Sequence, residues 1–516
     1  MIRSFFTVSS GTLASRLLGF VRDSMIAALL GTGAVADAFL VAFQLVNVVR
    51  RLLSEGALNA ALVPAWLRLR DAEGADAAAR FAGRVLGTIS AALIAVSLLI
   101  GLMMPLIIIV LAPGFADRDA LQFAVDDARL MLPYLAFAGP VTVMLALASA
   151  QSRFALTAFS PVLFNIALIA VMIALIISQR DAAFAALALA AAVGAAGLLQ
   201  LLILVLQRGD NTATPLRISF DAEMRGFLAR ALPGMTASAA PQLLMVAGAI
   251  IASASPSAVS WLYFANRLIE LPLGIVGVAM GTVLIPELTR ALQGGDKTTI
   301  AHAESRALEL AVGLALPATL GLIVLSTPIV RLLFEHGAFT PADTSATAQA
   351  LIWLALGLPA QVLAKALSPA FFAREDTRGP LRATLKALVV AVISAVLLGH
   401  TFGAAGIAAG IALGAWSNAL SLLRNGVAMF GFSVDQAARR RLPRIVAAAL
   451  IMGGLLWLAT TTIGPQTHGF WQTIALLGLI AGGIAIYGLF LALFAVTNWR
   501  EATDAIRSSP SSDLRT

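Results

Sequence analysis

The chain has 516 residues, of which 59% are hydrophobic and only 12% are charged, with a mean hydropathy of +0.91. Soluble domains carry about 25% charged residues, so this composition excludes a soluble globular protein and requires that most of the chain lies in lipid. The net charge of +8 therefore indicates the cytoplasmic loops of a membrane protein rather than a nucleic-acid partner, and the absence of cysteine excludes disulfides and thiolate metal sites.

Long apolar runs recur along the chain, and their length of about 18–30 residues is typical of membrane-spanning helices. They predict an all-α polytopic membrane protein with about fourteen transmembrane helices. In chain order the expected spans are 11–31, 34–66, 83–112, 128–151, 157–178, 183–206, 224–253, 258–289, 305–334, 345–372, 379–400, 403–427, 443–463 and 471–496. Charge interrupts the first run, so we expect no cleavable signal peptide.

Basic residues are concentrated in every second connection, most densely in ARRRLPR at 438–444. The remaining connections are short or acidic, such as GTGA at 31–34. By the positive-inside rule, this pattern predicts an even number of spans with both termini in the cytoplasm. One acidic outer connection contains Asp117, Asp119, Asp126 and Asp127, which we expect on a solvated face rather than around a metal ion.

An internal repeat relates the two halves of the chain. LAFAGPVTVMLALASAQSRFALTAFSP (135–161) resembles LALGLPAQVLAKALSPAFFAREDTRGP (354–380), with two prolines at matching positions in each copy. An even number of spans separates the copies, so the repeat is parallel, and two pseudo-two-fold lobes of six helices around a central site are expected. The expected divisions are the lobes 1–222 and 223–430, two added helices in 431–500, and a disordered cytoplasmic tail, 501–516.

Charged side chains stand inside the apolar runs, where each costs about 2.5–3.5 kcal/mol at mid-depth. Arg22 lies nine residues before Gly31 and eleven after Gly11, so it is roughly 13–16 Å from either end of its helix and too deep to reach the interface. Arg16 is shallower, and Asp23 returns to the face of Arg16 after seven residues.

Together these residues suggest a cationic cavity at the seam between the two lobes. The planar fork of arginine suits phosphate oxygens, so a large anion is the expected ligand. The candidate binding residues are Arg16, Arg22, Asp23, Asp37, Arg50, Arg51, Ser260, Arg267 and Glu270.

The alternative is that these charges only lock helices together. Arg16–Asp23 and Arg267–Glu270 have spacings that allow structural ion pairs. Arg22 and one of Arg50 and Arg51 would still lack an obvious acidic partner, and unpaired cations inside a membrane usually mark function. We therefore favour the binding interpretation for the set as a whole.

The stretch SRLLGFVRDSMIAALLGTGAVADAFLVAFQLVNVVRRLLSEGALNAALVPAW resembles the MurJ (formerly MviN) family of bacterial lipid II flippases. That family shares a superfamily with multidrug exporters of the MATE type and with polysaccharide flippases. The likeness continues through SWLYFANRLIELPLGIVGVAMGTVLIPEL and RLLFEHGAFT and covers nearly the whole chain. Gln44 departs from it, because the family commonly has a cavity lysine there. The resemblance implies cavity roles for Arg16, Arg22, Asp37, Arg50, Ser260, Arg267 and Glu270.

The implied function is translocation of lipid II, the undecaprenyl-diphosphate-linked peptidoglycan precursor, across the bacterial cytoplasmic membrane. Alternating access would carry the headgroup from the inner to the outer leaflet for cell-wall biosynthesis, with the lipid tail along the two added helices. Expected partners are lipid II, membrane lipids and the cell-wall synthesis machinery, without nucleic acid. We expect no cofactor, and the sequence does not identify a coupling cation.

Two other function classes have distinct signatures. A cation-coupled multidrug or polysaccharide-lipid exporter of the same superfamily is the main alternative, and a drug exporter should have an acidic or apolar cavity. An enzyme acting on polyprenyl phosphates should expose metal-binding carboxylates at the membrane interface, and no such cluster stands out in the sequence.

Overall fold

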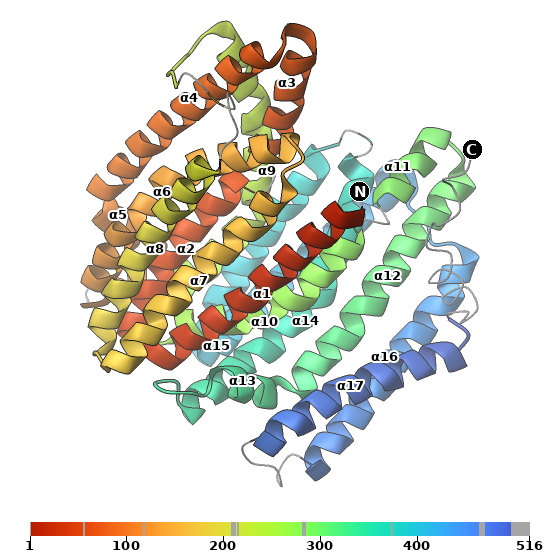
Figure 1. Ribbon diagram of the computed structural model, residues 1–516. Helices are drawn as coiled ribbons and strands as arrows, with labels where there is room; N and C mark the ends of the chain where they lie inside the picture. Colours follow the sequence, from red (N-terminus) through yellow and green to blue (C-terminus); the bar gives the residue numbers. More distant parts are fainter. Residues whose placement is uncertain are drawn as a thin grey trace. The chain divides into compact units, whose positions relative to one another are not determined.

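The structure is a computed structural model that describes residues 2–54, 57–116, 119–207, 213, 216–280, 285–372, 374, 376–463 and 470–496. Across these residues the chain is almost entirely α-helical and contains no strand (Figure 1). Nine helices among them are long and apolar enough to cross a membrane. The predicted class, an all-α polytopic membrane protein, is confirmed, and the count of about fourteen spans stays a prediction.

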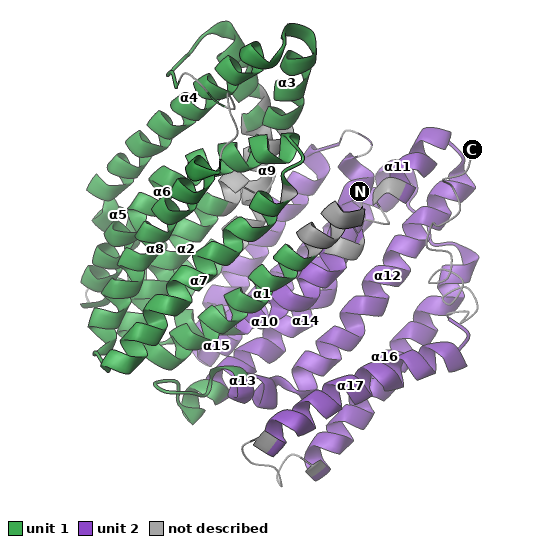
Figure 2. Cartoon of the chain, in the orientation of Figure 1, with its two compact units in different colours: residues 1–264, 333–344 green, residues 265–332, 345–516 purple. Residues whose placement is uncertain are grey.

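The helices group into two compact units (Figure 2), Met1–Phe264 with Leu333–Thr344, and Ala265–Leu332 with Ser345–Thr516. The boundary between the units falls inside a helix. The predicted lobes, 1–222 and 223–430, follow sequence symmetry rather than packing, and they stay a prediction.

The first unit is built around α6, which packs against α2 and α8, while α1 lies beside α7 (Figure 1). Its core includes a cluster of large side chains in which the rings of Phe81 and Phe227 meet edge to face with centroids 5.8 Å apart. The helices that begin in this unit are α1 (Ile2–Leu30), α2 (Ala34–Ser54), α3 (Ala57–Glu73), α4 (Ala75–Leu102), α5 (Met104–Leu111), the 3-10 turn η1 (Pro113–Phe115), α6 (Asp119–Ala150), α7 (Phe154–Ser178), α8 (Ala182–Leu206), α9 (Ala222–Ala252) and α10 (Ala258–Ala279).

Two predicted spans of this unit each contain two helices. The run 34–66 contains α2 and most of α3, with the residues between them outside the described range. The run 83–112 divides into α4 and α5 at Met103, two residues before Pro105. Proline lacks an N–H group and its ring clashes with the carbonyl four residues earlier, so the helix breaks there.

The second unit carries the C-terminal helices, with α16 packed against both α12 and α17 (Figure 1). A core cluster contains Phe371, whose ring meets that of Phe430 at a centroid distance of 5.0 Å. The helices are the rest of α10, then α11 (Ile285–Gly294), α12 (Lys297–Val324), α13 (Ser326–Phe334), which ends in the first unit, α14 (Pro341–Phe372), α15 (Arg378–Phe430), α16 (Gln436–Ile463) and α17 (Phe470–Leu493).

The long helix α15 consists of two arms that fold back at Gly403, where φ is 57° and ψ is −137°. A glycine adopts this conformation without steric cost. Beyond it, Gly406, Gly410 and Gly414 lie so close to the first arm that a Cβ on any of them would overlap its atoms. Small residues at this spacing allow two helix backbones to touch. The two arms match the predicted spans 379–400 and 403–427.

Candidate functional site

Arg22 is buried in α1, with 10% of its side chain exposed. Its Nε and Nη2 donate to Oδ1 of Asp23 at 2.9 and 2.7 Å, and its Nη1 donates to Oδ1 of Asn165 in α7 at 3.1 Å. The guanidinium carbon also lies 5.1 Å from the ring centroid of Phe43 and 5.9 Å from that of Phe164. These distances are within the range of cation–π attraction. The prediction that Arg22 lacks an acidic partner is therefore wrong.

The hydrogen bonds of Arg22 leave part of its capacity unused. A guanidinium group has five N–H donors, and the bonds to Asp23 and Asn165 occupy three of them. Counting only the residues that the structure describes, two N–H donors therefore remain for a further acceptor, on a side chain that is nearly closed off from solvent. Asp23 itself is fully buried and also accepts from the Tyr263 hydroxyl at 3.4 Å. Chemically, the arrangement is a fixed, partly neutralised cation that can still bind an anionic oxygen.

Asp37 and Ser260, both buried in the first unit, are joined by hydrogen bonds. Oδ1 of Asp37 accepts the Ser260 backbone N–H at 2.9 Å and also the Ser260 hydroxyl. Ser260 stands in the first turn of α10, whose N–H groups have no acceptor within the helix. Asp37 of α2 thus caps α10 from 223 residues away. The carboxylate is also favoured there by the positive end of the helix dipole.

The other predicted residues of the first unit have different surroundings. Arg50 is half-buried near the end of α2, and its Nε lies 3.4 Å from Oδ1 of Asn47. Arg16 is exposed on a face of α1 that also carries the exposed side chains of Leu13 and Leu17. The side chain of Arg51 lies outside the described residues.

Arg267 and Glu270 form an ion pair in the second unit. Nη1 of Arg267 donates to Oε2 of Glu270 at 2.8 Å, one turn further along α10, and about a quarter of each side chain is exposed. This pair is the one that the sequence spacing allowed. A single cavity that gathers it with Arg22 stays a prediction.

Sequence reasoning missed Asn165 and misjudged Asp127. Asn165 donates to the backbone carbonyls of Ser15 and Pro161 at 3.1 Å each while accepting from Arg22, so it ties α7 to α1. Its signal was available, since it is the one amide in the apolar run 157–178 and polar residues inside spans are usually retained for a reason.

Asp127 was expected on a solvated face, but it is 1% exposed in α6, so that expectation is wrong. Asp117 lies outside the described residues.

The nine long apolar helices among the described residues define a multi-pass membrane protein, and two solved transporters share its fold. A solved structure of a lipid II flippase MurJ in an inward closed conformation has a TM-score of 0.78 at 23% identity, covering 94% of this chain and 98% of that one. An inward-facing MATE family transporter of the MOP superfamily has a TM-score of 0.65 at 17% identity, covering 83% and 95%.

Sequence comparison identifies the family to which the chain belongs. The profile of the lipid II flippase MurJ family matches residues 26–479. The probable lipid II flippase MurJ of Rhizobium meliloti is 40% identical over 502 residues, covering 94% of this chain and 92% of that protein. That of Rhizobium tropici is 37% identical over 530 residues, covering 100% and 99%. The chain belongs to the lipid II flippase MurJ family, and the resemblance seen along nearly the whole sequence is confirmed.

Proposed function

We propose that this protein is a lipid II flippase of the bacterial inner membrane, with both termini in the cytoplasm. It moves the undecaprenyl-diphosphate-linked precursor from the inner to the outer leaflet for peptidoglycan synthesis. The observation that carries the proposal is family membership over nearly the whole chain together with a buried arginine that keeps two N–H donors available. Cell-wall synthesis enzymes are the proposed recipients of the flipped lipid.

Arg22 is the proposed contact for the diphosphate. Asp23 and Asn165 hold its guanidinium in one orientation, so little side-chain entropy is lost when an anion arrives. The neighbouring Asp23 offsets one positive charge, which keeps the empty site stable inside the membrane. A diphosphate can accept the two remaining N–H donors of Arg22 without displacing either partner.

Arg267 contributes from the second unit in this proposal, and Arg16, Arg50 and Arg51 add positive charge along the path of the headgroup. Alternating exposure of the site to the two membrane faces moves the headgroup, while the tail stays in the bilayer. The proposed energy source is the membrane potential or an ion gradient, because transfer of charge across the membrane couples directly to either.

Alanine substitution tests the roles of the two arginines. In cells that depend on this protein, Arg22→Ala and Arg267→Ala should each reduce lipid II flipping to background while the protein accumulates normally in the membrane. Arg68→Ala, which removes an exposed arginine of α3, is the matched charge control and should flip at the wild-type rate. Wild-type flipping by either Arg22→Ala or Arg267→Ala would overturn the site.

A binding assay separates the flippase from a drug exporter of the same superfamily. The purified protein should bind lipid II and ignore a lipophilic cationic dye, because the candidate arginines repel cations. Dye binding that lipid II fails to displace would favour the exporter.

A further inference from the structure

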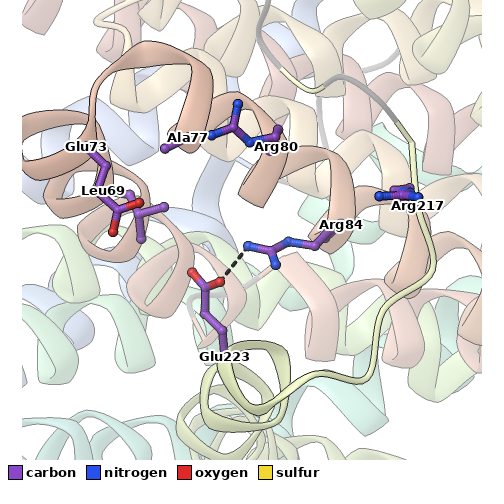
Figure 3. A pocket seen from close by; sticks show the side chains of 7 residues that line it. All are labelled: Leu69, Glu73, Ala77, Arg80, Arg84, Arg217 and Glu223. Carbon is purple, nitrogen blue, oxygen red and sulfur yellow. Dashed lines mark hydrogen bonds and ion pairs between the residues drawn. The ribbon is translucent and has the colours of Figure 1, made fainter.

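A basic pocket lies in the first unit where α3, α4 and the start of α9 meet (Figure 3), and Arg22 is not among the residues that line it. Its volume is about 240 Å³. Three arginines line it, Arg80 and Arg84 from α4 and Arg217 from the segment that precedes α9. The connections that contribute to it, 67–82 and 207–223, are both predicted to be cytoplasmic.

Arg84 is fixed in place by carboxylates. It donates to Asp221 at 2.8 Å and to Glu223 at 2.5 Å, and Figure 3 shows Glu223 reaching toward it from α9. The segment that carries Arg217 is tied to α4 as well. Thr88 donates to the carbonyl of Ser219 and accepts its backbone N–H, at 3.2 and 3.0 Å. These contacts hold the walls of the pocket in place relative to one another.

Arg80 and Arg217 differ from Arg84, because no ion pair involves either of them among the residues that the structure describes. Both are exposed at the pocket. With Arg84 neutralised, the pocket presents two cations against Glu73, the one lining carboxylate that does not bind Arg84. Two guanidinium groups on one small concave surface suit a phosphate.

The segment beside the pocket has a second property. Apolar side chains alternate with Arg217 and Ser219 along it, and they point outward: Leu216 and Ile218 are each 63% exposed and Phe220 is 68% exposed. This segment is a connection without helix, so these side chains do not belong to a helix face turned toward lipid. Large apolar side chains beside cations, at the end of a membrane helix, are typical of the membrane interface.

We propose that this pocket binds the phosphate of an anionic membrane phospholipid at the cytoplasmic face. Arg80 and Arg217 contact the phosphate, Arg84 shapes the pocket, and the acyl chains lie against Leu216, Ile218 and Phe220. Basic pockets between transmembrane helices on the cytoplasmic side are suited to such headgroups. The site is separate from the proposed lipid II site, and its test does not involve flipping.

The experiment measures lipid binding by the full chain. Purified protein in nanodiscs of phosphatidylcholine is titrated with phosphatidylglycerol, and lipid retention is followed by native mass spectrometry. The Arg80→Gln/Arg217→Gln variant should bind phosphatidylglycerol about 30-fold more weakly than wild type. Each arginine near a membrane surface adds about 1 kcal/mol of attraction to anionic lipid, so the loss of two corresponds to a factor of about 30. Both side chains are exposed, so the variant should fold, which its thermal midpoint in phosphatidylcholine alone checks.

Two further arms decide the assignment. Arg68→Gln removes an exposed arginine of α3 outside the pocket and should bind like wild type; if it weakens binding as much as the double variant, only general charge attraction remains and the pocket is overturned. Inorganic phosphate at millimolar concentration should not displace phosphatidylglycerol. Displacement by phosphate alone would reassign the pocket to a soluble anion and overturn the lipid proposal.

Discussion

The buried guanidinium group of Arg22 is stabilised by three kinds of partner: a carboxylate, an amide and two aromatic rings. Each removes part of the cost of burying the guanidinium, which would be several kcal/mol for an isolated ion. None of them saturates its donors. The structural and the binding interpretations of the sequence are therefore compatible. The same arginine forms an ion pair within the fold and is a candidate contact for an anion.

Asp37 and Ser260 allow a test of one buried contact at the level of single residues. Asp37→Ala should lower the free energy of unfolding by about 1–3 kcal/mol, because it leaves buried donors at the start of α10 without an acceptor. Ser260→Ala should cost less, since the backbone N–H still reaches the carboxylate. Thermal unfolding in detergent measures both changes.

The double variant is the control for this contact. If Asp37 acts through Ser260, the double variant should lose about 0.5–3 kcal/mol less free energy of unfolding than the sum of the losses of the two single variants. Strict additivity would show that Asp37 and Ser260 act independently, against the bonding seen here.

At the scale of elements, the fold of α15 depends on close approach of its two arms. Gly410→Ala should destabilise the protein by about 1–3 kcal/mol, because the added Cβ would overlap the backbone of Ala395 and force the arms apart. Gly454→Ala in α16 is the matched control, since nothing lies within 4 Å of its Cβ position. It should be neutral or slightly stabilising, as alanine favours helix more than glycine does. Equal effects of the two substitutions on thermal unfolding would contradict the packing argument.

The start of α9 should respond to acid. Asp221 precedes this helix and accepts the Met224 N–H, the Ser219 hydroxyl and Arg84, and these bonds lower the pKa of Asp221 below its ordinary value. A lowered pKa means that the stabilisation is present above the unfolded value of about 4 and is lost as the pH falls through the folded value.

Asp221→Asn keeps the cap but removes the charge, so it isolates this effect. The thermal midpoint of the wild type should exceed that of the variant at neutral pH, and the difference should shrink as the pH falls below about 4. A difference that stays constant between neutral and acid pH would show that the charge of Asp221 does not matter.

For the whole molecule, the predicted topology can be checked by labelling, because the chain contains no cysteine. Ala75, at the start of α4, and Gln179, between α7 and α8, are both exposed. In Gln179→Cys, a membrane-impermeant maleimide should react from outside intact spheroplasts. In Ala75→Cys it should react only after the membrane is opened, since an odd number of predicted spans separates the two positions. External labelling of Ala75→Cys would contradict the predicted topology and place this connection outside the cytoplasm.

Much of this architecture was accessible from the sequence, because a bilayer imposes a simple rule. Backbone groups in lipid must be bonded within their own segment, so long apolar runs become helices wherever they occur. The predicted helix segments therefore found counterparts in the structure. The exceptions lie at local breaks such as Pro105, where a long run divides into two helices.

The sequence by itself determined the helical class, the candidate arginines and the family, since these depend on composition, spacing and quoted motifs. Only the tertiary structure decided the partners: Asp23 bonds Arg22, Asn165 joins them from α7, and Asp37 caps α10. The physical reason is that a buried charge is stabilised by whichever polar group packing brings within about 3 Å, however far away that group lies in the chain. Helical periodicity predicts the face on which a side chain lies, whereas its partner depends on the helix that covers that face.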